Sequence, residues 1–378
     1  MSNSKFILFD LSFILSSQSL YSGVAKYSYR ILEYIVMTRR YDNYILLLNE
    51  STADVIRGQY PQFKFISIGK KWMKKTFFFK YFFYMYEFKK NVNYSGVDLV
   101  FCPYGGPVAC LEVKPKKICV IHDMQVRIDA KKKKKRDVWL YTKAEDLLMK
   151  NSSFVFTISN FSKKQILSFY PDDENKVINM SNSVSMVKNE YMVPMDLGCR
   201  YLLYCGRLYV QKNVMTLVKA FHRLSYDYSD LKLVLIAGEN KYWEKTIKPY
   251  AQENNLVDKI ILTGRCSEEE LSCWYMGATC FVFPSIREGF GFPPIEAAYM
   301  NVPVVCSKAD SLEEVTLGML NYYEPPMDDV KLADEIKKVM DNPPSLEHLR
   351  RIGEEYERHY SIEVVGARIC DFLEKQVL

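Results

Sequence analysis

The chain of 378 residues carries a net charge of +6, and its 48% hydrophobic and 25% charged residues describe a soluble globular protein with apolar material for two cores. No apolar run approaches the length of a transmembrane span, and the polar start MSNSKF is not a signal peptide. Ten cysteines without a C-x-x-C pair or a His/Cys cluster indicate reduced, mostly buried thiols in a cytoplasm, and exclude a disulfide framework or a zinc site.

The first half of the chain alternates short apolar runs with helical stretches. This alternation predicts a parallel sheet covered by helices on both faces. A loop after the first strand reaches Gly23, and an amphipathic helix follows from Val24 to Met37. No G-x-G-x-x-G appears there, which argues against a NAD site. The expected strands are Phe6–Asp10, Tyr44–Leu48, Phe65–Ile68, Leu99–Cys102, Ile118–Ile121, Phe154–Ile158 and Lys176–Met180.

Residues 70–90 are both basic and aromatic. They hold seven lysines against one acid, and nine of the twelve residues from Phe77 to Phe88 are aromatic. On a helix these rings would lie all round, so one core face could not bury them all. We expect contact with an anionic membrane or a partner, and burial within the domain under a lysine-rich rim is the open alternative. No nucleic-acid fold motif accompanies the segment, so no nucleic-acid partner is expected.

Six consecutive cations, Lys131 to Arg136, follow the strand that ends at Ile121-His122-Asp123. Such a run is usually a solvated loop. Its place after a strand puts it on the ligand-binding side of a doubly wound sheet. We expect it to hold a phosphorylated or pyrophosphate-linked acceptor, or to rest on anionic lipid. His122, one of four histidines, is a candidate site residue, although a lone histidine is more often structural.

The second half repeats the alternation, after a connection from Met186 to Cys199. Gly206 and Arg207 open the loop after its first strand, and Lys212 lies where a helix starts, so two cations project toward one edge of the sheet. Taken alone, they would be ordinary surface cations. The expected strands are Tyr201–Cys205, Lys232–Ala237, Ile260–Thr263, Thr279–Pro284 and Val302–Val305.

The stretch TCFVFPSIREGFGFPPIEAAYM, from Thr279 to Met300, joins a strand, a glycine loop and a helix start marked by a proline pair. Glycines let the backbone approach a ligand, and the helix start offers free N–H groups, so the stretch predicts an anion site suited to phosphate. Glu288 in the loop and Glu296 in the first helical turn flank it, and carboxylates there suit sugar hydroxyls. A structural turn with a capping glutamate is the alternative.

Glu288 and Glu296, with GFGFPP between them, resemble the E-x7-E signature of retaining GT-B glycosyltransferases, specifically family 4. GRLYVQKN resembles the G-R-x4-K-N motif of the same family, and His122-Asp123 its short His-Asp element. The resemblance implies a GT-B fold, with two Rossmann-like doubly wound parallel-sheet domains that face a central cleft. The domains would be 1–190 for the acceptor and 200–360 for the donor, with helix 361–378 packing back on the first.

The resemblance also implies a role for each site residue. The first glutamate contacts the donor sugar, the second binds the nucleotide ribose, and the loop amides meet sugar and diphosphate. The Arg and Lys grip the diphosphate, and the histidine lies next to the donor sugar and the acceptor. Gly23 would lie at the cleft, unless it only starts a helix, and Arg265 near the base is a weaker candidate. The candidates are Gly23, His122, Gly206, Arg207, Lys212, Arg265, Glu288, Gly289, Phe290, Gly291, Phe292 and Glu296.

We therefore expect a retaining hexosyltransferase that uses a GDP- or UDP-linked sugar, with mannose as the first guess, and needs neither a metal nor a cofactor. The acceptor would be a glycan or a lipid-linked saccharide in bacterial O-antigen or capsule synthesis, at the inner face of the cytoplasmic membrane. The alternatives are a soluble enzyme with a small-molecule acceptor, or an epimerase or nucleotide-sugar-binding protein on the same fold. The oligomeric state is not predicted.

Overall fold

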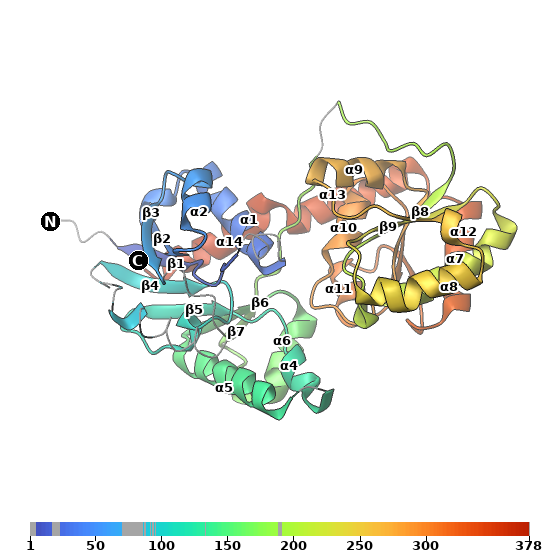
Figure 1. Cartoon of the computed structure of the whole chain (residues 1–378). Coiled ribbons are helices and arrows are strands. Elements are labelled where there is room, and N and C mark those ends of the chain that lie inside the picture. Colours follow the sequence, from blue (N-terminus) through green and yellow to red (C-terminus); the bar gives the residue numbers. More distant parts are fainter. Residues whose placement is uncertain are drawn as a thin grey trace. The chain divides into compact units, whose positions relative to one another are not determined.

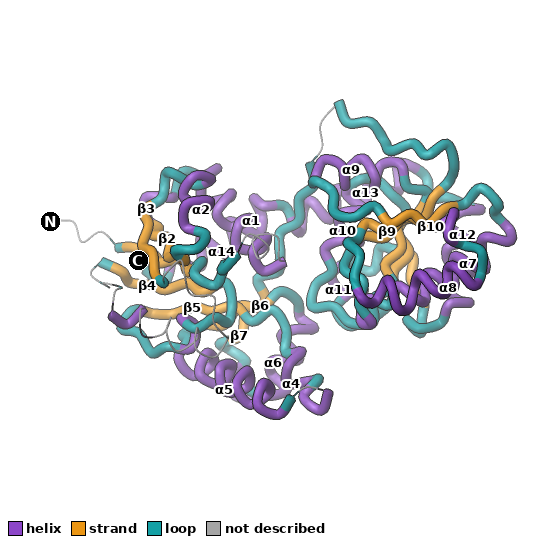
Figure 2. The backbone as a smooth tube through the Cα atoms, viewed as in Figure 1, coloured by secondary structure: helices purple, strands orange, loops and turns teal. Residues whose placement is uncertain are grey.

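The computed structural model describes residues 5–16, 23–69, 86, 88–90, 92, 94, 96–132, 134–187 and 191–377. The chain divides into two compact units, Met1–Ser183 with Ile362–Leu378, and Val184–Ser361 (Figure 1). The basic and aromatic segment 70–90 lies outside the described residues, apart from Tyr86 and Phe88 to Lys90. In each unit the strands form a central sheet between helices (Figure 2).

The first unit contains a parallel sheet of seven strands in the order β3-β2-β1-β4-β5-β6-β7. Each expected strand is present there, with ends shifted by no more than two residues. Its strands are β1 Phe6–Asp10, β2 Tyr44–Asn49, β3 Lys64–Ile68, β4 Val97–Cys102, β5 Lys116–Val120, β6 Phe154–Thr157 and β7 Val177–Asn179. Its helices are α1 Gly23–Met37, α2 Ala53–Gln59, α4 Gln125–Ile128, α5 Lys135–Asn151, α6 Asn160–Phe169 and α14 Ile362–Lys375.

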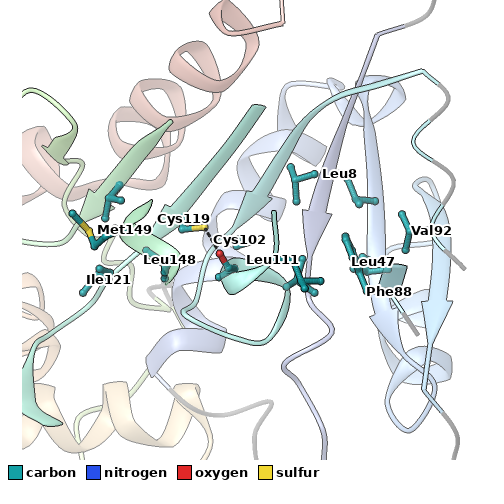
Figure 3. Packing of buried hydrophobic residues seen from close by; sticks show 14 of the residues in the cluster. Leu8, Leu47, Phe88, Val92, Cys102, Leu111, Cys119, Ile121, Leu148 and Met149 are labelled. Atoms are coloured by element: carbon teal, nitrogen blue, oxygen red, sulfur yellow. Dashed lines mark hydrogen bonds between the residues drawn. The ribbon is translucent and has the colours of Figure 1, made fainter. Parts of the chain in front are cut away.

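The core of the first unit gathers side chains from several strands and from α5 and α6. Leu8 and Leu47 come from neighbouring strands, and Leu148 and Met149 close the cluster from α5 (Figure 3). On α14, a Cβ added at Gly366 would lie 2.3 Å from Cγ of Tyr34 on α1, so only glycine permits this approach of the two helices.

The second unit contains a parallel sheet of six strands in the order β10-β9-β8-β11-β12-β13. Its strands are β8 Tyr201–Cys205, β9 Lys232–Ile236, β10 Ile260–Leu262, β11 Cys280–Phe283, β12 Val304–Ser307 and β13 Asn321–Tyr323. Its helices are α7 Val214–Asp227, α8 Lys248–Glu253, α9 Glu268–Gly277, α10 Phe292–Tyr299, α11 Leu312–Val315, α12 Asp329–Asp341 and α13 Leu346–Tyr360. The expected connection 186–199 lies within this unit, where Met195 N–H donates to the Cys273 carbonyl at 2.9 Å.

Both sheets share one topology. In each, the third strand in chain order lies at one edge, and the direction of winding reverses between the first and fourth strands. In open sheets of this kind, ligands bind at the carboxyl ends of the strands beside that reversal. We therefore expect ligands to bind at the loops after β1 and β4 in the first unit, and after β8 and β11 in the second.

Candidate functional site

Loops after β8 and β11 bring together two side chains that are far apart in sequence. Lys212 Nζ lies 2.5 Å from Glu288 Oε1, and the side chains are 28% and 11% exposed. The ammonium also lies 5.7 Å from the centroid of the Phe283 ring, at the end of β11. A partly buried carboxylate next to an ammonium forms a strong, charge-assisted hydrogen bond. The pair presents both charges at the reversal point of the second sheet.

Backbone contacts tie these two loops to each other. The carbonyl of Gln211 accepts from Ile286 N–H at 2.9 Å and from Ser285 Oγ at 3.1 Å. Asn213, with a left-handed φ of 55°, donates from its amide to the Pro284 carbonyl at 3.0 Å. Asparagine tolerates this conformation better than most residues, and the turn sets where Lys212 projects. The distance between Lys212 and Glu288 is thus held by main-chain geometry.

The start of α10 is built as a potential anion site. Gly291 has φ of 95°, and a Cβ added there would lie 2.5 Å from Cδ2 of Leu312. Within the described part of the chain, the N–H groups of Phe290, Gly291 and Phe292 donate to no protein acceptor. Free amides at a helix start attract negative charge. The N–H of Glu288, in contrast, already donates to Asp310 Oδ2 at 3.1 Å.

Glu296 lies deeper than the sequence suggested. Because α10 begins at Phe292, Glu296 is in the second helical turn, and the expectation of the first turn was wrong. It is 7% exposed, and its Oε2 accepts from the hydroxyl of Tyr275 on α9 at 3.3 Å. Burial raises the pKa of Tyr275 well above its ordinary value, so this hydroxyl stays protonated and donates.

Three further candidates lie on strand-end loops of the same unit. A Cβ added at Gly206 would lie 2.8 Å from the hydroxyl of Tyr204, so a side chain there would displace that ring. The Tyr204 hydroxyl donates to the Arg207 carbonyl at 3.1 Å and fixes this loop. The side chains of Arg207 and Arg265 are exposed and, among the described residues, form no ion pair. They remain available for an anionic ligand.

His122 lies just after β5 in the first unit and is half-buried. Its Nε2 lies 2.9 Å from the Pro103 carbonyl, and its ring meets Tyr27 edge-on at 5.2 Å. Burial lowers the pKa of His122, so the ring is neutral at pH 7. A carbonyl only accepts, so Nε2 carries the proton and Nδ1 keeps its lone pair. Nδ1 can therefore accept a hydrogen bond from a hydroxyl.

Gly23 starts α1 and is exposed, and a Cβ added there would meet nothing within 4 Å. Its own unit therefore does not require glycine. Gly23 and His122 both belong to the first unit.

Most of the described part of the cationic run is helical, which corrects the expectation of a loop, and Lys134 between the two helical pieces is extended. Lys131 and Lys132 lie in the 3-10 turn Ala130–Lys132, and Lys135 and Arg136 begin α5. Lys131, Lys134, Lys135 and Arg136 are exposed, and one turn later Trp139 is 63% exposed. Trp139 was not singled out from the sequence.

Sequence reasoning missed two groups. Asp10, at the carboxyl end of β1, is 1% exposed, and its Oδ1 accepts from Ser12 N–H at 2.9 Å and from Ser12 Oγ at 2.6 Å. Asp310 and Ser311, in the loop after β12, both bond the main chain of Glu288. A carboxylate at a strand end was a signal for Asp10, whereas spacing gives no signal for Asp310.

Over the described ranges, no helix is long and apolar enough to cross a bilayer. In the same ranges, no three His, Cys, Asp or Glu side chains gather as they would around a metal ion.

Comparison with known proteins bears on the second unit most directly. Residues 194–358 match the family model of glycosyl transferases group 1. The O-antigen chain mannosyltransferase RfbU of Salmonella typhimurium is 29% identical over 219 residues, which cover 58% of this chain and 60% of that protein. The chain thus matches less than two thirds of the length of this relative.

Solved structures match nearly the whole chain. The sucrose-phosphate synthase of Thermosynechococcus elongatus superposes with a TM-score of 0.77 at 16% identity and covers 98% of each chain. Anabaena Alr3699/HepE, solved in complex with UDP-glucose, superposes with a TM-score of 0.71 at 12% identity and covers 98% of this chain and 99% of its own. With its two parallel-sheet α/β units, the protein has the GT-B fold, as the sequence predicted.

Proposed function

We propose that the protein is a retaining glycosyltransferase of family 4, which moves a hexose from a nucleotide-diphosphate sugar to an acceptor hydroxyl. The observation that carries the proposal is the Lys212–Glu288 pair beside the unpaired amides of residues 290–292, at the reversal point of the second sheet. A cation and amides suit a diphosphate, and a carboxylate suits sugar hydroxyls. The match to glycosyl transferases group 1 supports the same conclusion.

The chemical difficulty is the charge that builds on the diphosphate as it leaves. The bond between the sugar C1 and the diphosphate oxygen breaks, and the acceptor oxygen bonds C1 on the same face. The departing phosphate takes the acceptor proton. Lys212, Arg207 and the free amides would stabilise the charge where it develops, as preorganised donors do in other transfer enzymes. Because cations of the protein serve this purpose, we propose a reaction without a metal.

The other roles follow from the positions of the residues. Glu288 would accept hydrogen bonds from sugar hydroxyls, and Glu296, oriented by Tyr275, would bind the ribose. Gly206 gives the diphosphate room, and Arg265 would lie near the base. In the first unit, His122 Nδ1 would accept a hydrogen bond from a hydroxyl of the donor sugar or the acceptor.

Mannose is the first candidate for the sugar, because RfbU carries the name of an O-antigen chain mannosyltransferase. The donor would be GDP- or UDP-linked, and Alr3699/HepE was solved with UDP-glucose. By the same likeness, we propose a glycan or lipid-linked acceptor in surface polysaccharide synthesis, at the inner face of the cytoplasmic membrane. The exposed cations and Trp139 at the start of α5 support contact with an anionic bilayer there.

The test is calorimetric titration of the purified chain with UDP, GDP, UDP-glucose and GDP-mannose, followed by a transfer assay with the sugar that binds. We expect one nucleotide class to bind, and Lys212→Ala to abolish transfer without unfolding the protein. A folded wild type that binds none of the four would overturn the proposal. Conversion of the free nucleotide sugar to its epimer would favour an epimerase, and binding without transfer to any acceptor would favour a binding protein.

A further inference from the structure

Two neighbouring residues after β12 hold the main chain of Glu288 from both sides. Asp310 Oδ2 accepts from Glu288 N–H at 3.1 Å. Ser311 Oγ donates to the Glu288 carbonyl at 2.9 Å, and lies 3.4 Å from the Phe290 carbonyl. Both peptide groups of Glu288 are therefore fixed by one dipeptide, Asp310-Ser311, which lies in the loop after β12.

The dipeptide is itself held in place. Ser311 is fully buried, and Asp310 is half-buried with φ of 51°, a conformation that aspartate tolerates better than most residues. Ser311 also caps the turn beyond it, because its carbonyl accepts from Val315 N–H at 2.9 Å. The position of the Glu288 main chain therefore depends on that of the loop after β12.

With its main chain fixed, Glu288 has little freedom except in its side chain, which is 11% exposed and meets Lys212. This main chain keeps the carboxylate within reach of the sugar of a donor, whereas a free nucleotide has no sugar for the carboxylate to contact. Interactions that depend on placement are lost when the supporting contacts are lost, even if the interacting group remains.

We propose that Asp310 and Ser311 are positioning residues, which hold Glu288 where it distinguishes a nucleotide sugar from the free nucleotide. The inference rests on the proposed function, because it assumes that a nucleotide sugar occupies this site. The preference for a nucleotide sugar over the free nucleotide would then depend on two residues that contact Glu288 only through its main chain.

The experiment measures, by calorimetry, the dissociation constants of UDP, UDP-glucose, GDP and GDP-mannose for the wild type and for Asp310→Ala, Asp310→Asn and Ser311→Ala. The readout is the ratio of affinities of the nucleotide sugar and its free nucleotide. Because a charged hydrogen bond is lost, we expect Asp310→Ala to lower this ratio roughly tenfold, with the free nucleotide bound about as before. Asp310→Asn keeps an oxygen that accepts from Glu288 N–H, and should restore most of the ratio.

The matched control is Asp328→Ala. Asp328 also accepts from main-chain N–H groups, those of Val330 and Lys331, both at 3.0 Å, but does so at the start of α12. It should lower stability while leaving the ratio unchanged. If Asp310→Ala does not fold, Ser311→Ala carries the same test, because it removes only a hydroxyl.

Two results would overturn the inference alone. One is a wild-type ratio in both Asp310→Ala and Ser311→Ala, and the other is an equal loss of affinity for free nucleotide and nucleotide sugar. A wild type that binds neither kind of ligand would instead overturn the proposed function, and the inference with it. The wild-type titration therefore separates the two failures.

Discussion

Lys212 and Glu288 neutralise each other in a partly buried place, so a change to either leaves a charge without its partner. Replacing Glu288 by glutamine should have opposite effects on two ligands. The ammonium of Lys212 should bind free UDP or GDP about threefold more tightly, because it no longer has to break an ion pair with Glu288 first. Sugar transfer should fall on the order of a hundredfold or more, because a neutral amide accepts hydroxyl hydrogen bonds more weakly.

Calorimetry with the free nucleotide and a transfer assay with the nucleotide sugar measure both effects of Glu288→Gln. Glu335→Gln is the control, because Glu335 is also a partly buried glutamate that pairs with a lysine, Lys338, but both lie in α12. Weaker binding of the free nucleotide by Glu288→Gln would contradict the idea that Lys212 leaves Glu288 to bind the diphosphate.

The burial of Asp10 should make the stability of the protein depend on pH. Burial raises its pKa from 3.8 to about 6, against the hydrogen bonds from Ser12 and the charge of Lys117. The folded state thus binds the proton more tightly than the unfolded chain. The free energy of unfolding should fall as pH rises from about 4 to 6, and then stay level, with a loss from this group of up to about 3 kcal/mol.

Asp10→Asn can still accept both hydrogen bonds from Ser12 and has no charge to bury. It should match the wild type near pH 4 and be more stable above pH 6, as thermal melts over that range would measure. A difference between the two proteins that does not change with pH would show that Asp10 ionises without cost in the folded state.

At the scale of elements, the start of α10 depends on one glycine. Gly291→Ala would place a Cβ against Leu312 and strain a backbone with φ of 95°. We expect a loss of stability of about 1–3 kcal/mol and a loss of nucleotide binding, because the free amides would move. The control is Gly58→Ala in α2, where a Cβ meets nothing within 4 Å. Denaturant melts measure the stability of each variant, and calorimetry measures its nucleotide binding. Unchanged nucleotide binding by Gly291→Ala would show that these amides do not bind the nucleotide.

The elements were largely predictable, because buried parallel strands are apolar runs and helix starts carry local signals. One such signal is the capping box at the start of α9, where Ser267 and Glu270 exchange hydrogen bonds of 2.8 and 3.1 Å. Strand β13 was not expected, because Asn321–Tyr323 is only three residues long and is not an apolar run. The cations at the start of α5 were assigned to a loop, because charge alone does not report a helix that is held by packing of its later turns.

The site was predictable only where its residues lie in one local motif. Glu288, Gly291 and the start of α10 could be found from the order of strand, loop and helix. The pairing of Glu288 with Lys212 depends on the neighbouring positions of β8 and β11, which a single sequence does not encode locally. Asp310 acts through its contact with a main chain 22 residues away, so no spacing rule could identify it.

At the scale of the whole molecule, one uninterrupted run of cations stands out from a sequence in which charges of both signs are mixed. Residues 131–136 supply six cations, in a chain whose net charge is +6. If this surface binds anionic lipid, Lys134→Glu with Lys135→Glu and Trp139→Ser should abolish sedimentation with phosphatidylserine vesicles, because each lysine near such a surface contributes about 1 kcal/mol.

Wild-type binding to those vesicles should weaken with salt, since screening shortens the range of the attraction. The control for charge is Lys241→Glu with Lys245→Glu, which alters two exposed lysines of the second unit. If the control loses vesicle binding as fully as the variant of α5, net charge rather than this surface attracts the bilayer.

Helix α14 returns to the first unit after the whole of the second has been made. Val184 N–H donates to the Tyr360 carbonyl at 2.7 Å, so the second unit begins and ends at one place, as an inserted domain does. During translation, the ribosome must complete the second unit before α14 can cover α1. The nascent first unit therefore exposes the face around Tyr34 throughout that interval, and this face is where we expect chaperones to engage the growing chain.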